Sequence, residues 1–175
     1  MFVRRVVAGV SGSGVSVQAL RYAADLARCH DAVLVPVLAY TPPGGEFADR
    51  RYPCAELRAV WKESAWDRLW RAVDMAIGGP PDGLGFRPQV IQGDPGAALT
   101  LLARQPGDVL VIGAGRHGDL RRSVHCRVAR YCLGHAACPV MAVPAPELAA
   151  AAHGLRGWMD RHRLQPEDAQ APAGA

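Results

Sequence analysis

The chain has 175 residues, of which half are hydrophobic, and carries a formal net charge of +4. This length suits one domain of ordinary size with a sizeable core, and the charge alone is too small to argue for a nucleic-acid partner. No apolar stretch approaches the roughly 20 residues that a membrane helix needs, and the run at residues 6–10 is too short for the core of a signal peptide. We therefore expect a soluble, cytoplasmic protein.

Short apolar runs alternate with segments of helical periodicity, as in a parallel sheet with crossover helices. The runs expected to form strands are residues 3–10, 32–39, 86–91, 108–112 and 139–143. The segments expected to form helices are residues 17–27, 57–77, 95–105 and 127–135. This pattern predicts an α/β domain over residues 1–145. The Ala-rich tail, residues 146–175, is expected to hold one short helix and then to be disordered.

Local signals mark several element boundaries. Ser13 or Ser16 is expected to cap the first helix, whereas Asp94 and Pro95 supply the N-cap and the first position of the third. Pro36 is awkward inside the second strand because proline cannot donate to a ladder, so a bulge or a solvent-facing position is expected there. The tryptophans of the second helix are expected to pack rather than to form a binding cage.

Two glycine-rich turns follow the first and fourth strands, at residues 11–14 and 113–118. In an open α/β sheet, ligands bind outside the carboxyl ends of the strands, where the strand order reverses. If the first and fourth strands are neighbours, both turns border one site. Backbone N–H groups and a helix amino terminus there favour an anion such as phosphate.

The second turn also fits the pattern G-x-G-x-x-G through Gly113, Gly115 and Gly118. The dinucleotide fingerprint belongs in a first strand–helix unit, with an acidic residue about 20 positions later. Here only one strand follows the turn, and no acidic residue lies between Asp119 and Glu147. The pattern therefore does not indicate an NAD or FAD domain.

The first turn resembles the S-G-G-x-D-S loop of ATP pyrophosphatases. Ser13 stands in place of a glycine, and Val15 stands in place of the aspartate. An enzyme of this type is thus a remote alternative.

Three segments resemble the universal stress protein family: VVAGVSGSGVSVQALRYAADLA, GDVLVIGAGRHGDLRR and RYCLGHAACPVMAVP. The similarity covers about residues 3–144, and the closing H-A-x-C-P-V is its most specific part. The resemblance implies an open five-stranded parallel sheet in the order 3-2-1-4-5, with helices on both faces. It also implies a homodimer formed by the last strand, residues 139–143. An apolar edge strand there agrees with this, because such edges need covering.

Many family members bind ATP through the pattern G-x₂-G-x₉-G-[S/T]. Ungapped alignment places its first glycine on Gly113, but the other positions fall on Arg116, Cys126 and Arg127. The family's aspartate after the first strand falls on Ser11. Ala39 corresponds to a position that contacts adenine. The resemblance therefore implies a degenerate ATP or AMP site. Its residues are Val10, Ser11, Gly12, Ala39, Gly113, Gly115, Arg116, Gly118, Cys126, Arg127 and Val128.

The departures from the ATP motif leave two interpretations open. Cys126 restricts close backbone approach to a phosphate, and Arg127 removes a hydroxyl donor. Arg116, Arg121, Arg122 and Arg127 can instead grip phosphate through their planar guanidinium groups, or they form a solvated loop face. We expect a nucleotide-binding stress-response regulator without strong catalysis. The alternative is a homodimeric interaction module that binds no nucleotide.

The cysteines and histidines do not indicate a metal site or a disulfide framework. The chain has an odd number of cysteines, five, and no C-x-x-C pair, so packed free thiols are expected. His125, Cys126, Cys132, His135 and Cys138 contain no short-spaced ligand pair. Cys126 is the candidate for a lowered thiol pKa, because arginines and a helix start are expected beside it. No catalytic constellation is visible, which predicts a non-enzyme or at most weak ATP hydrolysis. The basic loop lacks interleaved aromatic residues, which argues against nucleic-acid binding.

Overall fold

The computed structural model of the chain describes residues 2–45, 51, 53–114 and 124–144, without the side chains of residues 124–126. The described residues all belong to the first of two units, Met1–Ala145; the second is Pro146–Ala175. The short helix and the disorder predicted for the tail lie outside the described residues.

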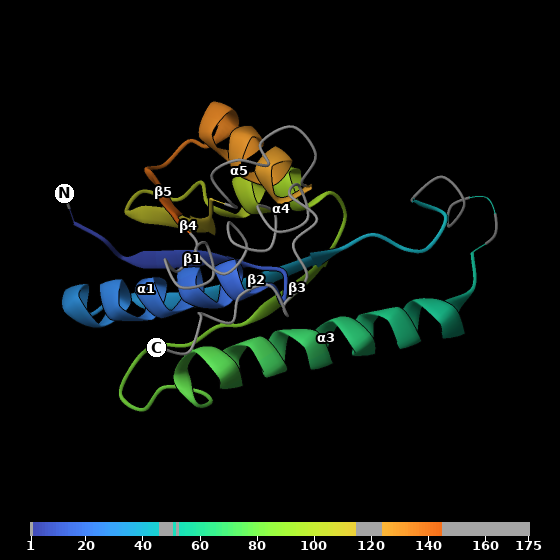
Figure 1. The fold of residues 1–175 in the computed structure, drawn as a ribbon, viewed down its shortest axis with the longest axis horizontal. Helices are drawn as coiled ribbons and strands as arrows, with labels where there is room; N and C mark the ends of the chain where they lie inside the picture. The colour runs from blue at the N-terminus through green and yellow to red at the C-terminus, as the bar shows by residue number, and fades with distance from the viewer. Residues whose placement is uncertain (1, 46–50, 52, 115–123, 145–175) are drawn as a thin grey trace, which may run out of the picture. The chain divides into compact units, whose positions relative to one another are not determined.

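The described part of the chain forms one parallel sheet (Figure 1). Its strands lie in the order β3-β2-β1-β4-β5, which confirms the predicted topology. The strands are β1 (Arg5–Val10), β2 (Val33–Tyr40), β3 (Gln89–Gln92), β4 (Asp108–Gly113) and β5 (Val140–Val143). The predicted third strand was placed too early: of its first residues, Phe86 makes only an isolated bridge to Leu34.

The late start of β3 accommodates Pro36 inside β2. Leu34 turns its backbone toward the β3 side, since its N–H donates to the Gly85 carbonyl at 2.8 Å and its carbonyl accepts from the Arg87 N–H at 2.9 Å. Alternate residues of a strand bond the same neighbour, so the backbone of Pro36 also faces the β3 side. The segment opposite it lies just before Gln89, where β3 has not yet begun, so no ladder hydrogen bond is lost because Pro36 has no N–H. Pro36 itself is buried, so an unpaired backbone position inside the fold, rather than exposure of the residue, accommodates the missing donor.

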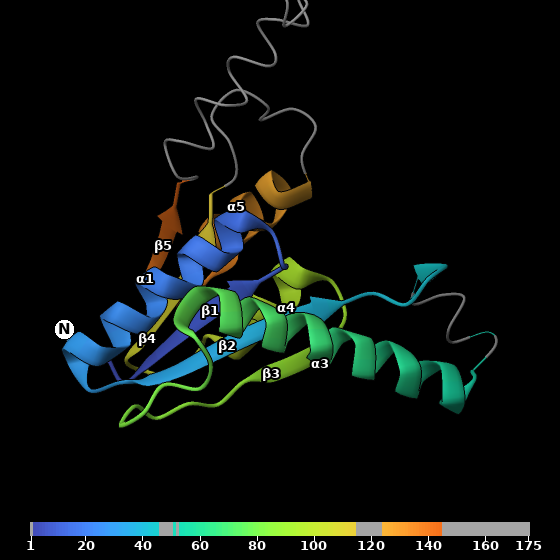
Figure 2. The ribbon, with the colours of Figure 1, turned by 60° about the horizontal axis from the view of Figure 1, so that its bottom comes forward.

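Helices cover both faces of the sheet, as predicted (Figures 1 and 2). On one face α1 (Gly14–His30) and α3 (Ala55–Ile77) pack over Val6, Ala8 and Val10 of β1. On the other face α4 (Pro95–Leu102) and α5 (Val124–His135) pack over Val7 and its neighbours in β2 and β4. Successive side chains of β1 point to opposite faces of the sheet, so they belong to two separate hydrophobic clusters.

The predicted helix caps are present. Ser13 caps α1, and its hydroxyl accepts from the Ser16 N–H at 3.3 Å. Asp94 caps α4, with one carboxylate oxygen accepting from the N–H groups of Gly96 and Ala97 at 3.0 and 3.2 Å. Two predicted helix boundaries were wrong by three residues each. The helix expected to end at residue 105 is α4, which ends at Leu102, and the helix expected to begin at residue 127 is α5, which begins at Val124.

Trp66 and Trp70 of α3 take part in packing, as expected. Trp66 packs against the hydrophobic cluster beneath α1 and α3 and stacks on Trp70, with ring centroids 6.4 Å apart. Trp70 in turn lies 6.0 Å from the ring of Phe86. These rings attach α3 to the segment that leads into β3.

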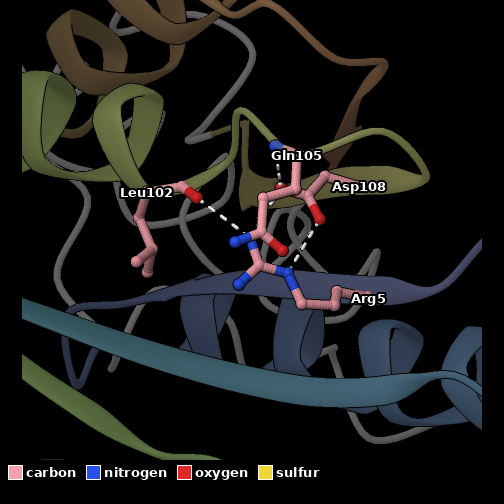
Figure 3. Close-up of polar contacts among 4 residues, drawn as sticks. All are labelled: Arg5, Leu102, Gln105 and Asp108. Atoms are coloured by element: carbon pink, nitrogen blue, oxygen red, sulfur yellow. Dashed lines mark hydrogen bonds and ion pairs between the residues drawn. The ribbon is translucent and has the colours of Figure 1, made fainter.

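A buried ion pair joins β1 and β4 at their amino ends (Figure 3). The Arg5 guanidinium donates to both carboxylate oxygens of Asp108, from Nε at 2.8 Å and from Nη2 at 2.7 Å. Nη2 also donates to the Leu102 carbonyl at 3.1 Å, and Asp108 Oδ2 accepts from the Gln105 N–H at 2.8 Å. The bond to Asp108 raises the pKa of Arg5. This network fixes the two strands at the end of the sheet opposite the glycine-rich turns.

The thiols differ in exposure, and we expect their reactivity to differ accordingly. Cys132 is buried, whereas Cys29 is exposed, contrary to the expectation of packed cysteines throughout. Burial raises the pKa of Cys132 from its ordinary value of 9.0 to about 11. At pH 8 its thiolate population should be about a hundredfold smaller than that of a thiol of ordinary pKa. Iodoacetamide should label Cys29 rapidly and Cys132 at least tenfold more slowly in a mass-spectrometric time course. Equal rates in the folded protein would contradict this.

Candidate functional site

The end of β4, where the second glycine-rich turn starts, meets the start of α1 at the carboxyl edge of the sheet. β1 and β4 are neighbours, and Gly113 at the end of β4 lies against Val15 in the first turn of α1. A Cβ atom on Gly113 would come within 2.7 Å of Val15 Cγ1 and 3.2 Å of the Val15 carbonyl carbon. Glycine is therefore what allows this close approach. The expectation that the first and fourth strands are neighbours is confirmed. Residues 115–118 of the second turn lie outside the described residues, so a site bordered by both turns stays a prediction.

The first turn is held by its own serines. The Ser11 N–H donates to Ser16 Oγ at 3.2 Å, and Ser16 Oγ donates to the Ser13 carbonyl at 2.8 Å. The hydroxyls of Ser11 and Ser13 share a hydrogen bond of 3.0 Å. Gly12 has φ of +82°, a left-handed conformation that favours glycine. Ser11 and Gly12 are exposed, so this turn is accessible to a ligand.

The start of α1 adds electrostatic preference to this turn. Gly14 and Val15 occupy the first two helical positions, whose N–H groups have no acceptor within the helix. The amino end of a helix also carries a partial positive charge. Residues 11–16 contain no acidic side chain. The edge beside β1 and β4 is therefore suited to an anionic group.

Arg68 of α3 joins the site, and the sequence analysis did not anticipate it. Its Nη2 donates to the backbone carbonyl of Ser11 at 3.4 Å. The two residues are 57 positions apart in the chain. No local sequence signal identifies Arg68 as a site residue, because the helical periodicity of its segment identifies only the apolar residues that face the core.

The second turn is described only at its start. The Ala114 N–H donates to the Val143 carbonyl at 2.7 Å, which continues the pairing of β4 with β5 by one residue. Of the predicted site residues, Gly115, Arg116 and Gly118 lie outside the described residues, as do Arg121 and Arg122, the other arginines of the predicted cluster. That these arginines bind phosphate in place of the glycines of the family's ATP motif therefore stays a prediction.

The start of α5 follows this undescribed stretch. Cys126 belongs to α5, but its side chain lies outside the described residues, so its predicted reactivity is not addressed. Arg127 is exposed and Val128 is half-buried. Arg127 is thus the one arginine of the predicted cluster that the described residues include.

The remaining predicted residues lie at the ends of β1 and β2. Ala39 is half-buried near the end of β2, one residue before Tyr40, whose carbonyl accepts from the Gly93 N–H at 2.9 Å. Val10 is 6 % exposed and belongs to the hydrophobic cluster beneath α1 and α3. Its side chain is therefore part of the core, and only its backbone lies at the edge.

The described ranges hold neither a metal-binding cluster nor a membrane-spanning helix. Within them, no three or more His, Cys, Asp or Glu side chains gather in a way that could hold a metal ion. None of the helices within these ranges combines the length and the apolar character that crossing a membrane requires.

The model of the universal stress protein family matches residues 3–144. The chain belongs to the universal stress protein family. Among curated proteins none matches this chain.

Solved universal stress proteins share the fold. One in complex with cAMP is 22 % identical, with a TM-score of 0.52 over 83 % of this chain and 100 % of that chain. UspA from Lactobacillus plantarum is 18 % identical, with a TM-score of 0.58 over 82 % of this chain and 99 % of that one. A protein from Archaeoglobus fulgidus is 21 % identical, with the same TM-score and coverage. Likenesses at this level of identity establish a common architecture.

Proposed function

We propose that this universal stress protein binds an adenine nucleotide, ATP or AMP, at the carboxyl edge of β1 and β4. The contact between Gly113 and Val15 carries the proposal, because it brings the start of the second glycine-rich turn beside the first turn and the amino end of α1. Support also comes from a relative of the same fold that was crystallised with cAMP. The role of a cytoplasmic stress-response regulator without strong catalysis is part of the proposal, and the resemblance to the family supports it.

The order of the strands suggests how the nucleotide lies. Adenine is assigned to the end of β2 near Ala39, and the phosphates extend across β1 toward Gly113 and Arg127. Ligands of open α/β sheets bind across the carboxyl ends of strands in this manner. Val15 supplies no carboxylate to this edge, so nothing in the first turn favours the ATP-pyrophosphatase alternative.

The direct test is calorimetric titration of the full chain with Mg-ATP and with AMP, at low and at physiological salt. Binding with a dissociation constant in the micromolar range that survives physiological salt would support the proposal. The absence of heat with both ligands, in a protein that is folded by circular dichroism, would overturn it.

Replacing Arg127 with alanine is expected to weaken ATP binding by about 1–3 kcal/mol, the range for a hydrogen bond to a charged group. Arg127 is exposed in the first turn of α5, next to the predicted phosphate loop. Arg104→Ala is the matched control. Arg104 is also exposed, but it lies at the opposite end of the sheet. It follows the end of α4, where the Leu102 carbonyl accepts from Arg5 at the amino end of β1. Equal affinities in the wild type and both variants would assign Arg127 to the solvated surface.

The edge strand β5 favours homodimerisation, which is shared by the nucleotide-binding regulator and by its alternative, an interaction module that binds no nucleotide. β5 pairs only with β4 among the described strands, and Met141 is 39 % exposed on it. Exposed apolar edges favour pairing with another strand. Met141→Glu is therefore expected to convert a dimer into a monomer in sedimentation equilibrium. A wild type that is monomeric at high micromolar concentration would contradict dimerisation through this edge.

A further inference from the structure

The amino half of α3 runs past the carboxyl edge of the sheet. The bond between Arg68 and the Ser11 carbonyl locates Arg68 at the end of β1. Residues 55–67 precede it in the helix and extend it by about 20 Å at 1.5 Å per residue. Figures 1 and 2 both show this part of α3 projecting beyond the ends of β2 and β3. The buried residues of α3 begin only at Ala65. The helix thus extends past the carboxyl edge of the sheet, and Arg68 lies where it meets that edge.

The guanidinium of Arg68 has donors to spare at this position. Arg68 is exposed, and its bond to Ser11 uses one of the five N–H donors of an arginine. Among the residues that the structure describes, no carboxylate forms an ion pair with it. The bond to the Ser11 backbone holds the group at the sheet edge without neutralising its charge.

The residue at position 11 decides whether that charge stays available. In the alignment with the family pattern, an aspartate falls on Ser11, and a carboxylate there would lie beside the Arg68 guanidinium and offset its charge. A serine carries no charge, and its hydroxyl is engaged with Ser13. The positive charge of Arg68 therefore adds to the partial charge at the start of α1.

The distance along the sheet edge identifies which phosphate Arg68 meets. Neighbouring strands lie about 4.8 Å apart. A base at the end of β2 therefore has its ribose and first phosphate about one to two strand spacings away, at the ends of β1 and β4. Arg68 occupies the end of β1. The phosphate attached to the ribose falls within its reach, whereas the later phosphates of ATP extend toward Arg127.

We infer that Arg68 is a ligand-binding residue that holds the ribose-attached phosphate, so that the site takes a nucleoside monophosphate in preference to a nucleoside. The inference rests on the proposed nucleotide site and adds to it a residue and a ligand class. A guanidinium binds phosphate through two parallel hydrogen bonds, which a lysine ammonium cannot reproduce.

The test compares AMP, adenosine and inorganic phosphate as ligands of the full-length protein by calorimetry. Arg68→Ala is expected to weaken AMP binding at least tenfold and to leave adenosine binding within twofold. Arg68→Lys, which keeps the charge but not the planar group, should lose less. Arg71→Ala is the matched control, since it removes the same charge from an exposed position further along α3, and should bind all ligands as the wild type does. Melting curves of each variant check that the fold is retained.

Each contrary result has a distinct meaning. A wild type that binds neither AMP nor adenosine would overturn the proposed function and this inference with it. A wild type that binds AMP while Arg68→Ala binds it equally well would overturn the inference alone. Equal losses for AMP and adenosine in Arg68→Ala would show that Arg68 only holds the Ser11 turn. Inorganic phosphate that binds as tightly as AMP, with the same dependence on Arg68, would replace the nucleotide by free phosphate as the ligand.

Discussion

Replacing Asp108 with alanine is expected to lower the free energy of unfolding by about 3 kcal/mol, the lower end of the range for breaking a buried ion pair. The Asp108 side chain is inaccessible to solvent, whereas that of Arg5 is 18 % exposed, and this exposure lessens the loss. The substitution leaves Arg5 with only the Leu102 carbonyl and leaves the Gln105 N–H without its acceptor. Urea denaturation followed by circular dichroism measures the change.

The control for this experiment is the surface ion pair between Asp25 and Arg28. Its atoms are also close, at 3.0 Å, but both side chains are largely exposed. Asp25→Ala should therefore cost less than about 0.5 kcal/mol, as exposed pairs do. If Asp108→Ala stays within about 1 kcal/mol of the wild type, the network at the amino ends of β1 and β4 is not a main source of stability.

Gly113→Ala is expected to lower the free energy of unfolding by about 1–3 kcal/mol and to weaken nucleotide binding more than tenfold. The added methyl group would lie 2.7 Å from Val15 Cγ1, and 3.2 and 3.3 Å from the carbonyl carbon and oxygen of Val15. Because backbone atoms cannot rotate away as a side chain does, the end of β4 must move from the start of α1. That movement separates the two turns that define the proposed site. Thermal melting and calorimetric titration with AMP measure the two effects.

Gly134→Ala provides the matched control for added volume. Gly134 lies in α5, where an added Cβ would meet no atom within 4 Å. Alanine is favoured over glycine in helices by up to about 1 kcal/mol, so this variant should be neutral or more stable. If Gly113→Ala behaves like Gly134→Ala in both assays, the contact with Val15 is not essential to the site.

The sequence could predict the fold well because the signals that define it are local or strongly periodic. Apolar runs separated by helical segments predicted the parallel sheet, and Ser13 and Asp94 marked two helix starts through side-chain chemistry within three residues. The resemblance to universal stress proteins added the strand order. The start of β3 was misplaced because the sequence around Phe86 does not show that this segment lies beside the part of β2 that contains Pro36, which has no N–H to donate.

The candidate site was predictable only in part. The sequence placed Ser11 and Gly113 at the carboxyl ends of two strands, since a turn after each apolar run must lie there. It did not distinguish the side chain of Val10, which is core, from the exposed Ser11 beside it. The burial of a strand-end residue depends on which helix lies over it, and a single sequence does not state this.

The sequence by itself determined the α/β architecture, the helix caps and the two turns, because each follows from the local chemistry and periodicity of a few residues. Only the tertiary structure decided that Gly113 lies against Val15, that Asp108 pairs with Arg5, and that Arg68 reaches Ser11. The physical reason is common to all three. Each contact joins residues that are distant in the chain, and its geometry depends on how a helix or strand packs against a neighbour rather than on the residues near it in sequence.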